Sequence, residues 1–169
     1  TGFTDLDRIL NGGLYPGLYI LGAMSSMGKT SFMLQMADQI TASGKDCLYF
    51  SLEMAEQELV AKSLSRLTFT LSAGDMALSK PAYMLSTKRY YHAMSDREKA
   101  HVRRAMEAYN SASGHLIVKE GVGDISIDDI KKAAADPDSK YLAIEGQETV
   151  ILRAAEKAMC VSGEAEWPE

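Results

Sequence analysis

Over the first 70 positions of the chain, continuous apolar runs alternate with segments in which apolar residues recur at helical spacing. Residues 18–21 and 47–52 are short continuous apolar runs, which are typical of buried strands. Apolar positions at helical spacing predict helices over 29–43 and 55–67, and Gly44 is a suitable residue to end the first of them. The resulting order of strand, loop, helix, strand and helix predicts a parallel sheet with right-handed crossover connections.

The pattern is less regular on either side of this unit. The spacing of Leu6, Ile9 and Leu10 predicts one short helix before the first strand, whereas residues 68–94 predict no clear element. Ser95 begins a predicted helix over 95–111, because Glu98 stands three residues later and completes a capping box. Four more elements are predicted: strands over 115–119 and 141–144, and helices over 126–135 and 148–159.

The composition is that of one folded domain. The chain has 169 residues and 18.4 kDa, with 46% apolar and 24% charged residues, and no apolar run is long enough to span a membrane. It starts at Thr1, so it is expected to be a piece of a longer protein. Cys47 lies in an apolar run, which favours a buried reduced thiol and a cytoplasmic location. The formal net charge of −5 argues against nucleic-acid binding by overall charge, but not by local loops.

The loop after the first strand has the pattern that holds nucleotide phosphates. Residues 23–30 read Ala-Met-Ser-Ser-Met-Gly-Lys-Thr, and Gly28 permits the backbone angles that turn successive N–H groups toward a phosphate. Lys29 reaches the β- and γ-phosphates, and the Thr30 hydroxyl is a ligand for Mg²⁺. A chance match in a Gly/Ser-rich turn is the alternative, but the strand before and the helix after are the context that the motif requires. The predicted phosphate contacts are Ala23, Ser25, Ser26, Met27, Gly28, Lys29, Thr30 and Ser31.

Three further side chains lie in or near this loop. Ser31 either approaches the α-phosphate or is an ordinary serine on the surface of the helix. The side chains of Met24 and Met27 are expected to pack against the protein rather than to contact a nucleotide.

Glu53 stands where the second strand ends, in the run Phe-Ser-Leu-Glu-Met. In a parallel sheet, functional groups gather at the carboxyl ends of the strands, so this carboxylate is expected to face the γ-phosphate and to act on the attacking water. A solvated glutamate at the start of a helix is the equal alternative from the residues alone.

Several motifs together resemble the ATPase domain of DnaB-type replicative helicases. They are Thr1-Gly2-Phe3-Thr4-Asp5-Leu6-Asp7, Gly12-Gly13-Leu14, Pro16-Gly17, Ser26-Met27-Gly28-Lys29-Thr30 and Phe50-Ser51-Leu52-Glu53-Met54. The resemblance continues more weakly through residues 125–135. It implies an α/β RecA-like fold with a mostly parallel sheet flanked by helices, in an incomplete form.

The resemblance also implies an activity and its site residues. By this resemblance Lys29 and Glu53 are catalytic, with Glu53 as the base, and Thr30 binds Mg²⁺. The intact family member hydrolyses ATP as a hexamer that moves along single-stranded DNA in replication. The family loop usually has proline where this sequence has Ser25, and we expect that change to leave binding intact.

The far part of the chain departs from the family. The aspartate that ends an apolar strand and assists the metal is missing, and the nearest candidate is Glu145, which is either a stand-in ligand for Mg²⁺ or an ordinary exposed glutamate. We therefore divide the chain into an ATPase core over residues 1–136 and an unrecognised segment over 137–169. That segment is expected to add one strand and one helix to the same domain.

Two other classes of function remain open from the sequence. Without the metal-side aspartate, the chain could be a nucleotide-binding interaction module with little hydrolysis. A small-molecule kinase is disfavoured, because no arginine-rich lid segment follows the loop. The one basic stretch is either a contact for a phosphate backbone or a solvated helix face; its residues are Lys88, Arg89, Arg97, Lys99, Arg103 and Arg104, with His92 and His101.

Overall fold

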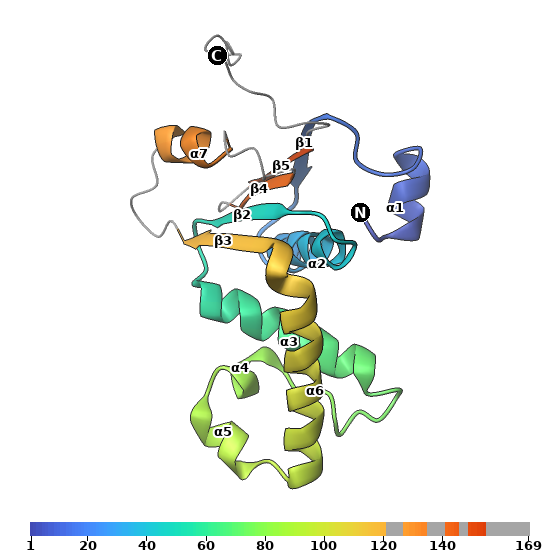
Figure 1. The fold of residues 1–169 in the computed structure, drawn as a ribbon, viewed down its shortest axis with the longest axis vertical. Coiled ribbons are helices and arrows are strands. Elements are labelled where there is room, and N and C mark those ends of the chain that lie inside the picture. The colour runs from blue at the N-terminus through green and yellow to red at the C-terminus, as the bar shows by residue number, and fades with distance from the viewer. Residues whose placement is uncertain (121–126, 135–140, 146–148, 155–169) are drawn as a thin grey trace.

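One five-stranded sheet forms the centre of the computed structural model, which describes residues 1–120, 127–134, 141–145 and 149–154 (Figure 1). The strands are β1 (Gly17–Gly22), β2 (Cys47–Ser51), β3 (Leu116–Glu120), β4 (Tyr141–Glu145) and β5 (Thr149–Ala154). The helices are α1 (Thr4–Ile9), α2 (Lys29–Ala42), α3 (Glu56–Leu71), α4 (Ala82–Leu85), α5 (Lys88–Ala93), α6 (Asp96–Ala112) and α7 (Ile127–Ala134), and a 3₁₀ turn (Ser113–His115) joins α6 to β3.

Four of the five strands run in the same direction. In the strand order β1-β5-β4-β2-β3, β2 pairs in parallel with both β3 and β4, whereas β5 pairs antiparallel with β4 and with β1. Because β5 reverses the direction twice, β1 is parallel to β2, β3 and β4. The prediction of a mostly parallel α/β sheet is therefore confirmed. The carboxyl ends of these four strands consequently meet at one edge.

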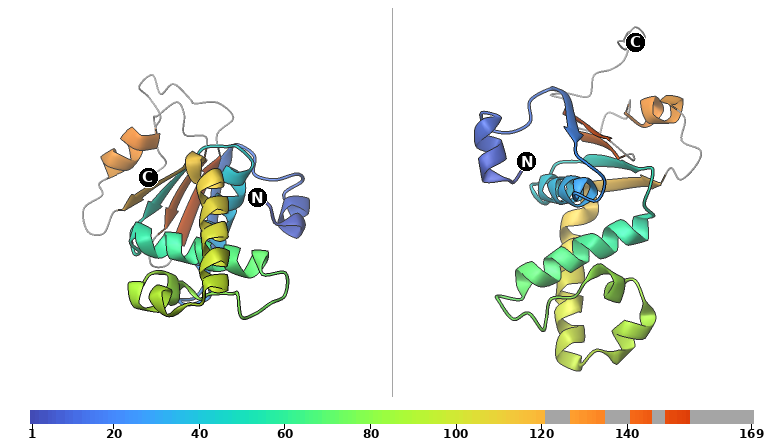
Figure 2. Two further views of the ribbon diagram at one scale, coloured as in Figure 1. Left: turned by 60° about the horizontal axis from the view of Figure 1, so that its bottom comes forward. Right: turned by 180° about the vertical axis from the view of Figure 1, so that it is seen from behind.

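The core lies between the sheet and α2. Every residue of β2 is buried, as expected for a strand whose two faces are both covered. α2 lies beneath the sheet, and α3 crosses below α2 (Figure 1, Figure 2). The buried side chains of this cluster are Met33, Leu34, Met36, Ala37, Ile40, Cys47, Tyr49 and Leu59. The segment before β1 joins this core through Phe3, whose ring stacks on that of Phe32 at 4.6 Å between centroids.

A buried ion pair joins α2 to α3. Asp38 on α2 is 8% exposed, and its Oδ2 accepts hydrogen bonds from Ser63 Oγ at 2.6 Å and from Arg66 Nη2 at 2.9 Å. Burial raises the pKa of the Asp38 carboxyl, while the Ser63 and Arg66 hydrogen bonds oppose that rise. Because both donors lie on α3, the pair fixes this helix against α2.

A layer of helices lies below α2, and it includes residues 68–94 that the sequence pattern left unassigned. α3 continues to Leu71, and two short helices, α4 and α5, then close the lower end against α6 (Figure 2). Helices of four and six residues are too short to show a helical period in the sequence. The layer is held by Thr68: its Oγ1 accepts from the Lys80 backbone N at 3.0 Å, and its carbonyl oxygen lies 2.9 Å from His101 Nε2.

The predicted elements outside that layer occur close to their expected positions, with one exception. Ser95 caps α6 as predicted, because its Oγ accepts from Glu98 N and Glu98 Oε2 accepts from Ser95 N, at 3.3 and 2.8 Å. The helix predicted over 148–159 is wrong where the structure describes it, because residues 149–154 form β5. Residues 148 and 155–159 lie outside the described parts of the chain.

β5 forms because of its composition. Thr149, Val150 and Ile151 are β-branched, a side-chain type that is restricted in helices and packs well in sheets. The helix-forming residues that suggested a helix come later, in the run Ala-Ala-Glu-Lys-Ala-Met from position 154. The C-terminal segment therefore adds two described strands rather than one strand and one helix.

Two further expectations concern the described residues. No helix among them is long and apolar enough to cross a membrane. Cys47 is 1% exposed and free, and burial raises the pKa of its thiol to about 12. This cysteine is therefore an inert core residue, as its apolar run predicted.

We predict that Glu98 makes the stability of the protein sensitive to acid. Hydrogen bonds from Lys80 and then from Ser95 lower its pKa from 4.5 to about 2. As pH falls from about 4.5 toward about 2, the unfolded chain therefore binds a proton that the folded chain does not, and stability is lost. Denaturant unfolding of Glu98→Gln at pH 7 and pH 3 should show lower stability at pH 7 and a weaker loss on acidification. Equal acid sensitivity in the variant would contradict this assignment, and Glu107→Gln, an exposed glutamate on α6, is the matched control.

Candidate nucleotide-binding site

The loop between β1 and α2 has the backbone geometry of an anion-binding turn. Residues 23–28 are exposed, and the backbone takes positive φ at Ser26 (64°) and at Gly28 (90°). Left-handed residues among right-handed ones turn neighbouring N–H groups toward the same side, which creates a concave site for phosphate. A Cβ at Gly28 would meet no atom within 4 Å, so this position requires glycine for its backbone angle and not for lack of space.

The N-terminus of α2 differs from those of the other long helices. α6 is capped by Ser95 and Glu98, and at the start of α3 a Glu58 carboxylate oxygen accepts from Ala55 N at 3.3 Å. α2 has no acidic residue in its first turn, and its N-cap, Gly28, has no side chain to accept a hydrogen bond. The positive end of the α2 dipole therefore faces the loop without a protein carboxylate, which suits an external anion.

The residues that follow the loop place a cation and a hydroxyl at this helix end. Lys29 folds back over the loop, and its Nζ donates to the carbonyl oxygen of Ala23 at 3.1 Å. Thr30 is half-buried in the first turn of α2, and Ser31 is exposed beside it. The expectation that Met24 and Met27 pack against the protein is wrong, since their side chains are 77% and 67% exposed.

Glu53 lies in the tight bend that follows β2. Its side chain is exposed. The bend is held from below by Ser51, a fully buried residue whose Oγ donates to the Met54 carbonyl oxygen at 2.7 Å and accepts from Met54 N at 3.1 Å. This pair of hydrogen bonds closes the backbone around residues 52 and 53, so Glu53 projects from a short, fixed turn.

A second contact fixes the same turn from the side. Glu120, the last residue of β3, accepts a hydrogen bond from the backbone N of Glu56, the first residue of α3. Sequence reasoning missed both Ser51 and Glu120. Ser51 could have been noticed as a polar residue that ends an apolar strand, whereas the contact of Glu120 depends on the pairing of β3 with β2, which the sequence does not show.

Glu145 lies at the same edge, between the loop and Glu53. The sheet register places Leu21, Val150, Glu145, Ser51 and Glu120 in one row across β1, β5, β4, β2 and β3. Neighbouring strands are about 4.8 Å apart, so the backbone of Glu145 is one step from β2 and two steps from β1. The structure thus brings Glu145 to the edge that carries the loop and Glu53. Among the described residues, no group of three or more His, Cys, Asp or Glu side chains could hold a metal ion, so a Mg²⁺ site here would be completed by phosphate oxygens and water.

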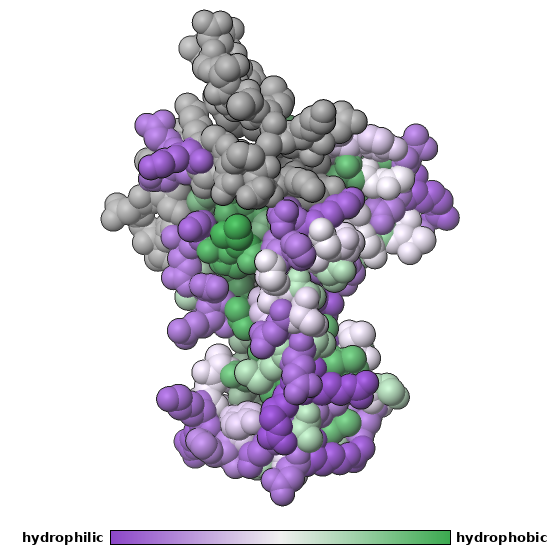
Figure 3. All heavy atoms as spheres, viewed as in Figure 1, coloured by the Kyte–Doolittle hydropathy of each residue, from purple (hydrophilic) through white to green (hydrophobic). Residues whose placement is uncertain are grey.

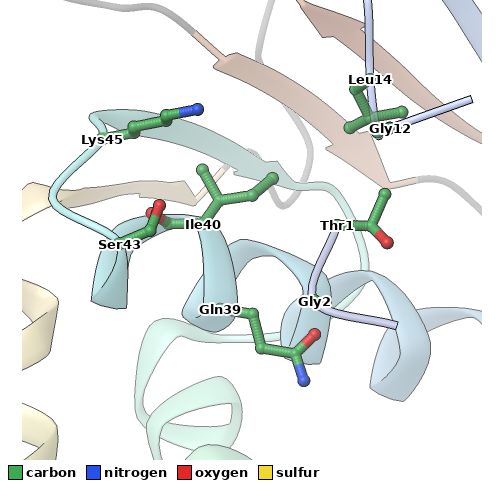
Figure 4. Close-up of a pocket in the computed structure, with 9 residues that line it drawn as sticks. Thr1, Gly2, Gly12, Leu14, Gln39, Ile40, Ser43 and Lys45 are labelled. Atoms are coloured by element: carbon green, nitrogen blue, oxygen red, sulfur yellow. The ribbon is translucent and has the colours of Figure 1, made fainter. Parts of the chain in front are cut away.

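Two hollows on the described surface are lined in part by α2. One, of about 250 Å³, is at the far end of α2, between Gln39 and Ile40 on one side and Thr1 and Leu14 on the other (Figure 4). The other, of about 400 Å³, separates α2 from α3 and begins at Ser31. Of the residues assigned to phosphate binding, only Ser31 lines either of these hollows, and residues 23–28 are exposed, so the loop forms an open edge.

One family model and several known proteins are similar to this chain. A family model described as the DnaB-like helicase C terminal domain matches residues 1–135. The replicative DNA helicase DnaB of Geobacillus stearothermophilus is 43% identical over 65 residues, which are 38% of this chain and 14% of that protein. Its counterpart in Helicobacter pylori J99 is 43% identical over 68 residues, 40% of this chain and 14% of that protein. The replicative DNA helicase DnaC of Bacillus subtilis is 42% identical over 65 residues, again 38% and 14%. The matched segment therefore spans 14% of the length of these relatives.

We predict that Ser51→Ala loosens the turn that carries Glu53. The change removes both hydrogen bonds to Met54 and leaves two backbone groups unpaired, which should cost about 1–3 kcal/mol of unfolding free energy. Hydrogen exchange at the Met54 amide should accelerate, with little change at amides of α6. Unchanged protection of Met54 would show that the hydroxyl does not hold the turn. Ser111→Ala is the matched control, because that exposed hydroxyl bonds only a carbonyl within its own helix.

Proposed function

Because the chain belongs to the DnaB-like helicase C-terminal domain family, we propose that it is the ATP-binding core of a replicative DNA helicase. In this proposal ATP is hydrolysed at the edge where β1, β2 and β4 end. The observation that carries it is the position of Glu53 and the phosphate loop at the same sheet edge, which follows from the parallel direction of β1 and β2. The core corresponds to residues 1–136, and the strands at 141–145 and 149–154 complete its sheet.

The triphosphate is bound by the loop and the first turn of α2. Backbone N–H groups of residues 23–31 surround the β- and γ-phosphates, and Ser31 lies on the α-phosphate side. The ammonium of Lys29 exchanges its contact with Ala23 O for phosphate oxygens and neutralises the charge that develops on them. The family loop usually carries proline at the position of Ser25, and serine, unlike proline, has a backbone N–H to donate.

Hydrolysis is assigned to Glu53. A water molecule attacks the γ-phosphorus in line with the bond to the β–γ bridging oxygen, that bond breaks, and the Glu53 carboxylate takes the proton from the water. The turn fixed by Ser51 and Glu120 holds the backbone of Glu53 at the edge, which limits the region that its carboxylate can reach and is a contribution to positioning.

The residues fit a single Mg²⁺ ion that accompanies the nucleotide. Thr30 offers a hydroxyl oxygen in the first helical turn, and Glu145 ends the strand between the loop and Glu53. Oxygen ligands completed by water and phosphate are the usual surroundings of Mg²⁺. When bound, the ion supplies positive charge beside the β- and γ-phosphate oxygens.

The wider function follows from the relatives named as replicative helicases. We propose that the chain acts in the cytoplasm as part of a ring of identical subunits, a hexamer, in which ATP turnover drives movement along single-stranded DNA. Since the matched segment is a small part of those relatives, neither ring formation nor translocation is expected of this chain alone.

ATP turnover by single variants tests the proposal. Lys29→Ala should abolish nucleotide binding, because it removes the cation from an otherwise uncharged loop. Glu53→Gln should bind ATP with normal affinity and lose at least about a hundredfold in turnover, the usual worth of a general base. Binding is measured by titration with a fluorescent ATP analogue and turnover by phosphate release, each with and without single-stranded DNA. Lys132→Ala on α7 and Glu107→Gln on α6 are the matched exposed controls.

The same measurements separate the nucleotide-binding module from the ATPase. A chain that binds ATP through Lys29 but shows equal, slow phosphate release in wild type and Glu53→Gln would be a binding module. Turnover that survives Glu53→Gln at the wild-type rate would remove Glu53 from the mechanism. Retained ATP binding in Lys29→Ala would overturn the assignment of the loop.

We predict that Glu145→Gln weakens the response to Mg²⁺. If Glu145 assists the metal, the Mg²⁺ concentration for half-maximal ATP binding should rise roughly tenfold, as for other residues that support a metal ion. Binding of the nucleotide without Mg²⁺ should not change, since phosphate contacts come from the loop. An unchanged Mg²⁺ midpoint would identify Glu145 as an ordinary glutamate at a strand end.

A further inference from the structure

The lower helical layer is basic, although the chain as a whole is acidic. Residues 82–112 contain six lysines and arginines and three aspartates and glutamates, whereas the formal net charge of the chain is −5. Hydrophilic residues cover much of this end of the molecule, with apolar ones between them (Figure 3). A local cationic surface on an acidic protein selects for a negatively charged partner at that place alone.

Two acidic groups near this layer are engaged in ion pairs, whereas Asp96 and Glu107 on α6 are exposed. Glu98 pairs with Lys80, and Asp75 pairs with Arg97 at 2.7 Å. His101 is buried against the Thr68 carbonyl oxygen, so it belongs to the core and not to the surface. The basic stretch seen in the sequence therefore divides into residues that hold the layer together and residues that face outward.

The outward-facing cations gather on and beside α5. Lys88 and Arg89 are exposed on this helix, and no ion pair joins them to a carboxylate within the described residues. Lys99 reaches the same helix from α6, where its Nζ donates to the His92 carbonyl oxygen at 3.2 Å. The short helix α5 thus carries two cations and is contacted by a third from α6.

Two exposed tyrosines stand among these cations. Tyr83 on α4 and Tyr90 on α5 are 56% and 42% exposed, and their rings meet edge to face, with centroids 5.5 Å apart. Both rings therefore keep open surface while they hold each other in place, which lowers the cost of ordering them around a partner.

We propose that this region binds single-stranded nucleic acid, by a contact separate from the nucleotide edge. The α5 surface consists of Tyr83, Lys88, Arg89, Tyr90, His92 and Lys99. The cations contact phosphates and the tyrosine rings stack on bases, the combination by which single strands are bound without regard to sequence. An acidic peptide would use the cations but has no flat bases to stack on the tyrosines, so the pairing of both features favours nucleic acid. That the strand is DNA rests on the proposed helicase function.

Binding of a fluorescein-labelled oligothymidylate of about 20 nucleotides to the 169-residue chain tests this surface. Fluorescence anisotropy at low salt should show a complex that the double variant Lys88→Ala/Arg89→Ala weakens at least about tenfold. The slope of log affinity against log salt should fall by about 1.4, since each phosphate contact to a single strand contributes about 0.7. Tyr83→Ala/Tyr90→Ala should weaken binding at least about fivefold, and Tyr83→Phe/Tyr90→Phe should not, because the rings still stack.

Matched variants make the outcome decisive. Arg103→Ala/Arg104→Ala removes the same charge from exposed α6 positions outside the α5 surface and should leave the affinity within about twofold. Equal losses in the two double variants, or no binding by the wild-type chain at low salt, would overturn the proposal. A polyglutamate peptide is the test for a protein partner. If the Tyr83→Ala/Tyr90→Ala variant loses as much affinity for this peptide as for the oligonucleotide, the surface would be assigned to protein partners instead. Lys29→Ala should keep oligonucleotide binding and lose ATP binding, so a failure of either site is recognised separately.

Discussion

The structure depends on a constraint that acts on one helix. α2 must bury one face along its length against the sheet and α3, and yet leave its first turn accessible at the sheet edge. Met33, Met36 and Ile40 anchor the body of the helix, while Gly28 supplies a left-handed residue and no capping side chain at its start. Burial positions the helix and its dipole, and the missing cap leaves the positive end for an external anion. The order of strand, loop and helix follows from this requirement.

The elements that sequence reasoning predicted well are those whose determinants are local. The phosphate loop is a fixed pattern between a strand and a helix, and the Ser95–Glu98 capping box marks its own helix start. β5 was mistaken for a helix because its β-branched residues are followed by strong helix formers, and its place between β1 and β4 depends on pairing across the sheet. The contact of Glu120 with the start of α3 was missed for the same reason, since it joins residues 64 positions apart.

Sheet order decides what the edge contains. β1 and β2 are not neighbours, because β5 and β4 lie between them, so the loop and Glu53 stand on either side of the strand that ends in Glu145. For the distance between β1 and β4, the presence of β5 between them matters and its direction does not, since either direction would leave the same spacing. An acidic residue at the end of β4 thus lies between the residues assigned to phosphate binding and to hydrolysis, although its sequence context gave no strong indication of that position.

The pair of Asp38 and Arg66 has a mechanical consequence for the whole molecule. Because Asp38 takes both of its side-chain donors from α3, sliding of one packed helix along the other would leave this buried carboxylate without partners, which is unfavourable. The two helices are therefore expected to move together as one rigid unit rather than to slide past each other. A small tilt of α2 on binding an anion at its N-terminus would therefore carry α3 with it. α4 and α6, which pack on α3, would then shift as well, although they lie far from the loop.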